Sequence, residues 1–159
     1  HDEDADDLNS RTHYIQLGNV LHAIFSRITT REDIPHVMAE LEEEGTVYGI
    51  GITPEDVRKA IERGMGNPDV AALFDSRWQV FNECTILTTE QDRTVEYRPD
   101  RVVSDGKETR VVDFKFGRPR PEHAQQVSGY MNLLKDMGYP QVTGYIWYVK
   151  QNRLEVVSL

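Results

Sequence analysis

Two short segments decide the fold of this chain: Arg98-Pro99-Asp100-Arg101 and, after a predicted turn, Val111-Val112-Asp113-Phe114-Lys115. Successive side chains on a β-strand point to opposite faces, so Asp113 and Lys115 share one face while the valine and phenylalanines around them share the other. The apolar face belongs in a core. The other face puts a carboxylate and an ammonium about 7 Å apart on an otherwise apolar strand, where isolated charges are costly.

A hairpin between the two segments brings a second carboxylate to the first. Asp105-Gly106 is a strong hairpin-turn pair, and a turn there folds Asp100 back beside Asp113. Pro99 lacks the N–H of a strand ladder, so it marks an edge or a bulge that re-aims its neighbour. Two converging carboxylates suit Mg²⁺ or Mn²⁺, and Lys115 could orient a water and stabilise charge on a phosphate. An ordinary ion pair or a solvent-facing hairpin edge is the alternative.

The rest of the sequence predicts helices followed by a sheet. Apolar spacing and capping signals predict helices over residues 14–28, 30–45, 53–66 and 68–74. Segments rich in β-branched and aromatic residues predict strands over 78–88, 95–104, 109–116, 142–149 and 154–159, with a helix over 122–137. We therefore expect one α/β domain with a mixed sheet and an N-terminal helical lobe.

Composition narrows the class of protein. The 159 residues, 38% of them hydrophobic, suit one globular domain, and no run approaches the ~18 apolar residues of a membrane-spanning helix. The single cysteine, Cys84, excludes an internal disulfide, a Cys-based zinc site and a four-cysteine iron–sulfur cluster. A reducing, intracellular setting is favoured. The chain starts at His1 without a methionine or signal-like segment, so we expect it to be a piece of a longer chain.

The charge balance is acidic, with 18 Lys+Arg, 27 Asp+Glu and a net charge of −9, which by itself disfavours an anionic partner. The distribution changes this inference. Acids are concentrated in the first residues, and we expect 1–10 to be a disordered acidic tail and 11–159 to be the folded domain. Glu83, Asp100 and Asp113 lie in apolar surroundings, where a divalent cation would neutralise part of their charge. Nucleic acid stays a candidate partner.

The ordered set of motifs resembles the PD-(D/E)XK nucleases of the restriction-endonuclease-like superfamily, through Pro99-Asp100 and Asp113-Phe114-Lys115. Flanking motifs are similar to the RecB-like branch, the nuclease domains of helicase–nucleases such as RecB and AddA. They are a G-x-x-x-H helix, a glutamate on the strand before Pro-Asp, and a Q-x-x-x-Y helix, matched here by Gly18 with His22, Glu83, and Gln126 with Tyr130. The resemblance implies a restriction-endonuclease-like core, a mixed sheet flanked by helices.

The resemblance also implies a role for each matched position. One or two Mg²⁺ or Mn²⁺ ions would be held by His22, Asp100, Asp113 and the backbone carbonyl of Phe114, with Glu83 as a further ligand or second-site acid. Lys115 would position the attacking water and contact the scissile phosphate. Gln126 and Tyr130, four residues apart on one helix face, would orient Lys115 or the DNA, although Tyr130 fits a core position equally well. The candidate catalytic residues are thus Asp100, Asp113, Lys115, Glu83, Gln126 and Tyr130.

Basic residues near these motifs are candidate DNA contacts. Arg118 and Arg120 follow the lysine strand in a short loop, and Arg101 follows Asp100, so all three could hold the phosphate backbone. A solvated loop is the alternative for the first two. Gly18, one turn before His22, could let the sheet or a ligand approach its helix.

We therefore expect a divalent-metal-dependent DNA nuclease domain, an exonuclease from the C-terminus of a UvrD/Rep-type helicase, acting in DNA end processing and recombinational repair. The implied partners are DNA, helicase domains of the same chain and a second helicase–nuclease subunit, in the bacterial cytoplasm at the nucleoid, with no membrane. No iron–sulfur cluster is expected. One alternative is a catalytically silent DNA-binding or scaffolding domain of the same fold. Another is a metal-dependent hydrolase of a small phosphate ester.

Overall fold

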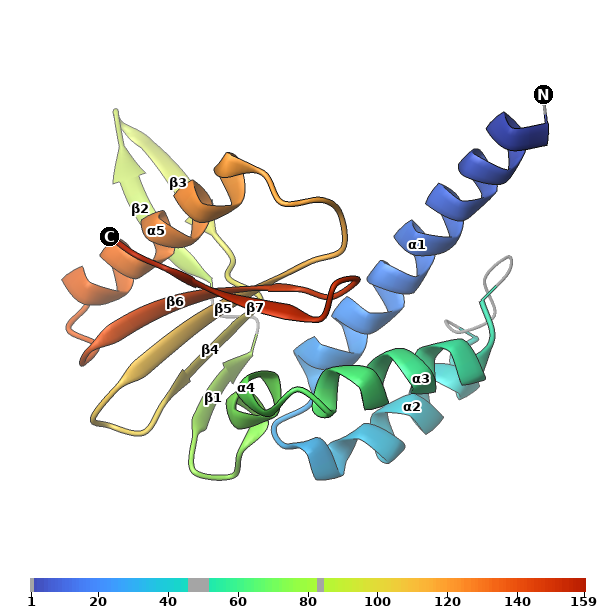
Figure 1. Ribbon diagram of the computed structural model, residues 1–159. Coiled ribbons are helices and arrows are strands. Elements are labelled where there is room, and N and C mark those ends of the chain that lie inside the picture. The colour runs from blue at the N-terminus through green and yellow to red at the C-terminus, as the bar shows by residue number, and fades with distance from the viewer. Residues whose placement is uncertain (1, 46–51, 83–84) are drawn as a thin grey trace.

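The computed structural model describes residues 2–45, 52–82 and 85–159, with side chains from residue 15 onward except for residue 82. The N-terminal part is helical (Figure 1), with α1 (Asp2–Arg27), the 3-10 turn η1 (Arg31–Asp33), α2 (Ile34–Glu43), α3 (Pro54–Met65), α4 (Pro68–Ala71) and η2 (Ala72–Phe74). The remainder comprises β1 (Gln79–Asn82), β2 (Ile86–Glu90), β3 (Arg93–Tyr97), β4 (Arg101–Ser104), β5 (Thr109–Lys115), α5 (Pro121–Asp136), β6 (Val142–Tyr148) and β7 (Arg153–Val157).

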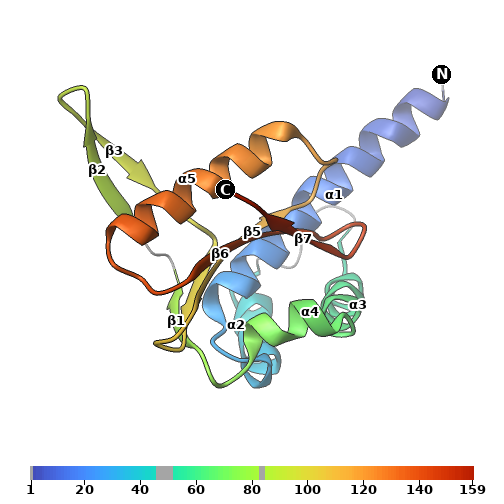
Figure 2. The same cartoon turned by 60° about the vertical axis from the view of Figure 1, so that its left-hand side comes forward.

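Five strands form one mixed sheet in the order β1-β4-β5-β6-β7, in which β5 and β6 are parallel and the other neighbours antiparallel. Helix α5 makes the crossover from β5 to β6 and covers one face of the sheet, while α2, α3 and α4 lie on the other side (Figure 2). The predicted restriction-endonuclease-like arrangement, a mixed sheet flanked by helices with a helical N-terminal region, is confirmed.

Each face of the sheet carries its own apolar core. Val112 and Phe114 point from β5 into the core formed with the N-terminal helices, which includes Phe25 of α1. Val111, on the opposite face of the same strand, packs with Val127 of α5. The alternation predicted for β5 is therefore confirmed, and Asp113 and Lys115 lie on the face that α5 covers.

Two predicted strands are each divided in the structure. Residues 78–88 give β1 and β2, and residues 95–104 give β3 and β4; β2 and β3 form a separate two-stranded sheet that projects beside α5 (Figure 1). Gln91 and Asp92 turn between β2 and β3 with φ of 48° and 61°, as a two-residue hairpin turn requires. Neither residue is glycine, which explains why the sequence pattern missed this turn. Pro99, without an N–H, stands where the chain passes from one sheet to the other.

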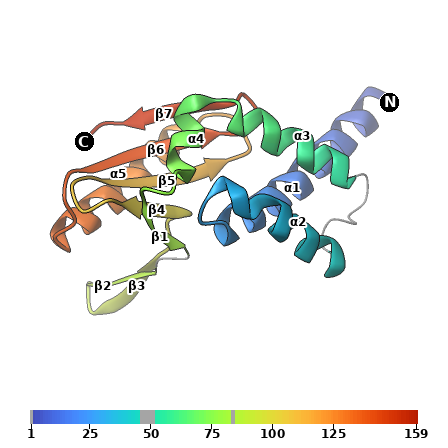
Figure 3. The same ribbon diagram turned by 90° about the horizontal axis from the view of Figure 1, so that it is seen from below.

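The acidic segment predicted to be a disordered tail is helical from Asp2 onward, as the first part of α1. This end of α1 extends away from the sheet in Figures 1 and 3. The division into a tail over 1–10 and a domain over 11–159 stays a prediction. The structure differs from it in that residues 2–10 are helical.

Gly18 allows α1 to approach the end of β5. A Cβ atom built on Gly18 would lie 2.8 Å from Cγ of Phe116, closer than packed carbon atoms come. The side chain that glycine lacks is therefore replaced by the Phe116 ring. This contact holds α1 against the end of β5 one turn before His22. Of the two predicted neighbours of Gly18, the sheet or a ligand, the structure shows the end of the sheet.

Arg101 connects the N-terminal helices to the sheet. Its guanidinium is fully buried and donates to the carbonyls of Ile28 at 2.7 Å, Thr29 at 2.7 Å and Leu73 at 3.2 Å. It also lies over the ring of Phe74. Burial lowers its pKa to about 10. The prediction that Arg101 contacts DNA is therefore wrong, because its donors are used inside the protein.

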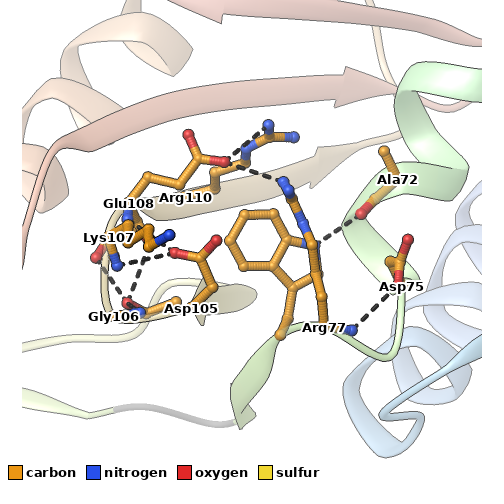
Figure 4. A network of polar contacts seen from close by, with 11 residues as sticks. Ala72, Asp75, Arg77, Asp105, Gly106, Lys107, Glu108 and Arg110 are labelled. Atoms are coloured by element: carbon orange, nitrogen blue, oxygen red, sulfur yellow. Dashed lines mark hydrogen bonds and ion pairs between the residues drawn. The ribbon is translucent and has the colours of Figure 1, made fainter.

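The predicted hairpin at Asp105-Gly106 is confirmed as the turn between β4 and β5 (Figure 4). Asp105 Oδ1 accepts hydrogen bonds from the backbone N–H groups of Lys107 and Glu108, each at 2.9 Å. Glu108 Oε1 in turn accepts from Arg77 at 3.0 Å and Arg110 at 3.2 Å. These contacts tie the turn to the segment before β1 and set the register that carries Asp100 to Asp113.

The substitution Arg101→Ala should lower the free energy of unfolding by about 3–5 kcal/mol, because it leaves buried carbonyls without a donor and opens a cavity. Urea denaturation followed by circular dichroism measures this loss. The matched control is Arg93→Ala, at the exposed tip of the β2–β3 hairpin, which should change stability by less than about 0.5 kcal/mol. Equal stability of the two variants would contradict the structural role of Arg101.

Candidate active site

The β4–β5 hairpin places Asp100 against Asp113. Arg101 and Val112 are paired in the ladder, so the next residues outward meet at its end. The backbone N–H of Asp100 donates to Asp113 Oδ1 at 3.2 Å, and the backbone N–H of Phe114 donates to Asp100 Oδ2 at 2.8 Å. Each carboxylate is thus held by the backbone of the opposite segment. Two like charges are fixed close together by these bonds.

His22 reaches the same carboxylates from α1. Its Nε2 lies 2.5 Å from Oδ1 of Asp100, and its ring meets the ring of Phe114 edge-on. The hydrogen bond to the Asp100 carboxylate raises the pKa of His22, against the opposing effect of burial. Three of the predicted metal-binding side chains, His22, Asp100 and Asp113, are therefore neighbours in a chain of contacts.

Asp113 is the most buried of these acids, with 2% of its surface exposed. Burial raises its pKa to about 6, and the negative charge of Asp100 acts in the same direction. Lys115 opposes the shift, since its Nζ lies 3.5 Å from Asp113 Oδ2. Two carboxylates therefore converge at one place, with Lys115 and His22 as their neighbours, and such a pair of oxygen ligands suits a hard divalent cation.

Lys115 is held by helix α5. Its Nζ donates to Oε1 of Gln126 at 2.9 Å, and Nε2 of Gln126 donates to the hydroxyl of Tyr130 at 2.9 Å. Tyr130 is buried and packs edge-on against Tyr97, and burial raises its pKa to about 12. Tyr130 thus occupies a core position while its hydroxyl accepts a hydrogen bond from Gln126. Its role in orienting Lys115 or DNA stays a prediction.

The donor set has the chemistry of a site for a hard divalent cation. Among the residues whose side chains the structure describes, no group of three or more His, Cys, Asp or Glu is arranged to hold a metal ion. In this arrangement both oxygens of Asp100 are engaged, with His22 and with the N–H of Phe114. Two carboxylates and an imidazole are nevertheless ligands that Mg²⁺ and Mn²⁺ accept. Glu83, the further predicted ligand, lies outside the described residues.

The basic loop between β5 and α5 lies directly after Lys115. Arg118 and Arg120 are exposed there, and their contact with DNA stays a prediction. The sequence reasoning did not single out His123, whose Nδ1 lies 3.1 Å from the hydroxyl of Tyr148. Burial, followed by the positive charges of Lys115 and Arg120, lowers the pKa of His123.

A comparison with protein family models identifies the superfamily of the chain. The model of the PD-(D/E)XK nuclease superfamily matches residues 3–158, and the chain belongs to that superfamily. Its members are generally nucleases that use Mg²⁺ or Mn²⁺, and DNA is the substrate that membership implies. No curated protein matches the chain. In the described part of the chain, no helix is both long and apolar enough to cross a membrane.

The substitution Asp113→Asn should reduce the pH dependence of stability in EDTA. Because folding raises the pKa of Asp113 from 3.8 to about 6, the folded state binds this proton more tightly than the unfolded state. The stability that results is complete below pH ~4 and is lost as the pH rises through ~6. Between those values the wild type should lose on the order of 1–3 kcal/mol more than the variant in urea titrations. Equal pH dependence of both proteins would contradict the burial of a charged Asp113.

Proposed function

We propose that this chain is a divalent-metal-dependent DNA nuclease domain of the RecB-like branch, which hydrolyses phosphodiester bonds. The observation that carries the proposal is the meeting of Asp100, Asp113 and Lys115 where β4 begins and β5 ends. Superfamily membership supports nuclease chemistry. The contacts of His22 with Asp100 and of Gln126 with Lys115 support the RecB-like assignment, because these residues occupy the motif positions that resemble that branch.

The residues that would hold Mg²⁺ or Mn²⁺ are His22, Asp100, Asp113 and the carbonyl of Phe114, with Glu83 as a further candidate. A bound divalent ion supplies positive charge that polarises a phosphate oxygen and lowers the cost of forming hydroxide from water. Asp113 and Asp100 contribute preorganisation, since backbone N–H groups fix both carboxylates before any ligand arrives.

Lys115 would bind the scissile phosphate and orient the attacking water. An ammonium has three N–H donors; one is directed to Gln126, another side of the group faces Asp113, and the side chain is still 24% exposed. A donor is thus available for a phosphate oxygen or a water. Tyr130 acts through Gln126 as a positioning residue, because its hydroxyl fixes which end of the amide faces Lys115.

We also propose that the domain works as an exonuclease in a helicase–nuclease of DNA repair and recombination, in the cytoplasm, with helicase domains as partners. The order of motifs from His22 to Tyr130 supports this part of the proposal. The net charge of −9 predicts weak, salt-sensitive DNA affinity for the domain alone. Such affinity suits a domain to which a helicase delivers its substrate.

A catalytically silent DNA-binding domain is the second candidate. It is favoured by one observation, that the described side chains include no ready group of three metal ligands. DNA binding without any cutting in Mn²⁺ would support this candidate. Cutting in Mn²⁺ would exclude it.

The nuclease proposal predicts DNA cleavage in Mg²⁺ or Mn²⁺ that EDTA abolishes. Asp113→Asn and Lys115→Met should each lower the rate by about 10²–10⁴-fold, because they remove a candidate ligand and the phosphate-binding cation. Gel assays on linear and circular DNA, single- and double-stranded, at low salt measure these rates and show whether an end is needed. Lys107→Met, in the exposed turn between β4 and β5, is the matched control. Full activity of Asp113→Asn would overturn the mechanism.

A further inference from the structure

Two hollows adjoin the candidate active site and share the side chain of Arg98. The first, of about 600 Å³, lies between α1 and the segment before β4, and His22 and Asp100 are in its wall. The second, also of about 600 Å³, lies between β3 and α5, with Gln126 and Gly129 in its wall. We call them the α1 hollow and the α5 hollow.

The two hollows contain different parts of the chemistry. Asp100, with its imidazole partner, borders the α1 hollow, whereas Gln126, which holds Lys115, borders the α5 hollow. A phosphate that reached both the aspartates and Lys115 would therefore lie between the hollows. The nucleotides on its two sides would enter one hollow each, and Arg98 stands at the boundary.

The size of the hollows favours unpaired nucleotides. Pockets of ~300–1,000 Å³ hold single small ligands, and a base reaches such a pocket only when it is out of the stack or on a single strand. A base pair joined to its neighbours does not enter. The hollows thus suit a single strand whose bases lie on either side of the bond to be cut.

The α5 hollow has the surfaces that a base needs. Tyr97 offers a partly exposed aromatic ring, and its orientation is fixed by the Tyr130 ring and by donation of its hydroxyl to Glu90 at 2.7 Å. Aromatic rings of this kind stack with any base. Gly129 of α5, also in the lining, has open space where a Cβ would lie, so no side chain fills the hollow at this position.

Arg98 is placed to hold a backbone phosphate. Its side chain is 70% exposed and pairs with Glu96, Nη2 to Oε1, at 2.8 Å. Exposed pairs of this kind contribute little to stability, so a phosphate can replace the Glu96 carboxylate at small cost. The guanidinium fork matches phosphate oxygens in a bidentate manner.

We propose that the α5 hollow binds one unpaired DNA nucleotide next to the scissile phosphate, with Tyr97 stacking on its base and Arg98 binding the phosphate at the boundary of the two hollows. The inference rests on the proposed function, because the place of the scissile phosphate comes from Asp100, Asp113 and Lys115. It names a nucleotide subsite outside the candidate metal ligands, formed by Tyr97 and Arg98 at the end of β3 and by Gly129 of α5.

Filling the hollow tests this subsite. Gly129→Leu puts a side chain into the open space on α5, and leucine favours a helix more than glycine does, so the melting temperature should stay equal or rise. We expect the dissociation constant for a fluorescent single-stranded oligonucleotide, measured by anisotropy in EDTA at low salt, to rise at least about tenfold. Asn132→Leu, exposed on the same helix and outside the hollow, should change it by less than about twofold.

Arg98→Gln should raise KM for the single strand by about tenfold and should lower kcat as well, since it removes a cation from the phosphate at which the bond is cut. Arg98→Lys should recover part of the affinity, and Arg93→Gln, exposed at the hairpin tip, is the control. A merely structural role for Arg98 would lower the melting temperature and would leave KM unaltered.

The outcomes separate this inference from the nuclease proposal. If Asp113→Asn abolishes cleavage while Gly129→Leu and Arg98→Gln bind and cut like wild type, the subsite is refuted and the nuclease stands. A duplex bound as tightly as the single strand, and lost equally in Gly129→Leu, overturns the single-strand assignment. A wild-type protein that neither binds nor cuts DNA overturns both proposals.

Discussion

The rest of the site depends on the two backbone hydrogen bonds that fix Asp100 against the strand of Asp113. Each carboxylate accepts a backbone N–H from the other's segment, so the acids are brought together by the strand ladder and not by attraction between them. Their like charges would otherwise separate. His22 and Lys115 are placed relative to this pair, because His22 approaches Asp100 and Lys115 follows Asp113 by two residues.

Forces on both faces of the sheet keep the pair in place. On one face, Phe114 packs with the N-terminal helices, and the buried Arg101 binds carbonyls at the end of α1 and in η2. On the other face, α5 holds Lys115 through Gln126. The far end of the hairpin is fixed by the Asp105 and Glu108 contacts (Figure 4). The two aspartates are thus held in place by packing and hydrogen bonds of neighbouring residues that are not themselves candidate metal ligands.

The sequence predicts the parts of the fold that follow from local periodicity. Alternation along β5 and the Asp105-Gly106 turn were enough to place Asp100 near Asp113, and helical spacing was enough to put Gln126 and Tyr130 on one face. The buried role of Arg101 could not be read in the same way, because its carbonyl partners lie far away in the chain. The separate β2–β3 sheet was missed since Gln91 and Asp92 make its turn without glycine.

We propose that Asp100 and Asp113 together form a divalent-cation site, and isothermal titration calorimetry with Mn²⁺ tests this site most directly. Wild-type protein should bind Mn²⁺, and Asp136→Asn, an exposed substitution at the end of α5, should bind it equally well. Asp100→Asn and Asp113→Asn should each abolish the binding heat. Mn²⁺ binding that survives unchanged in both variants would contradict the claim.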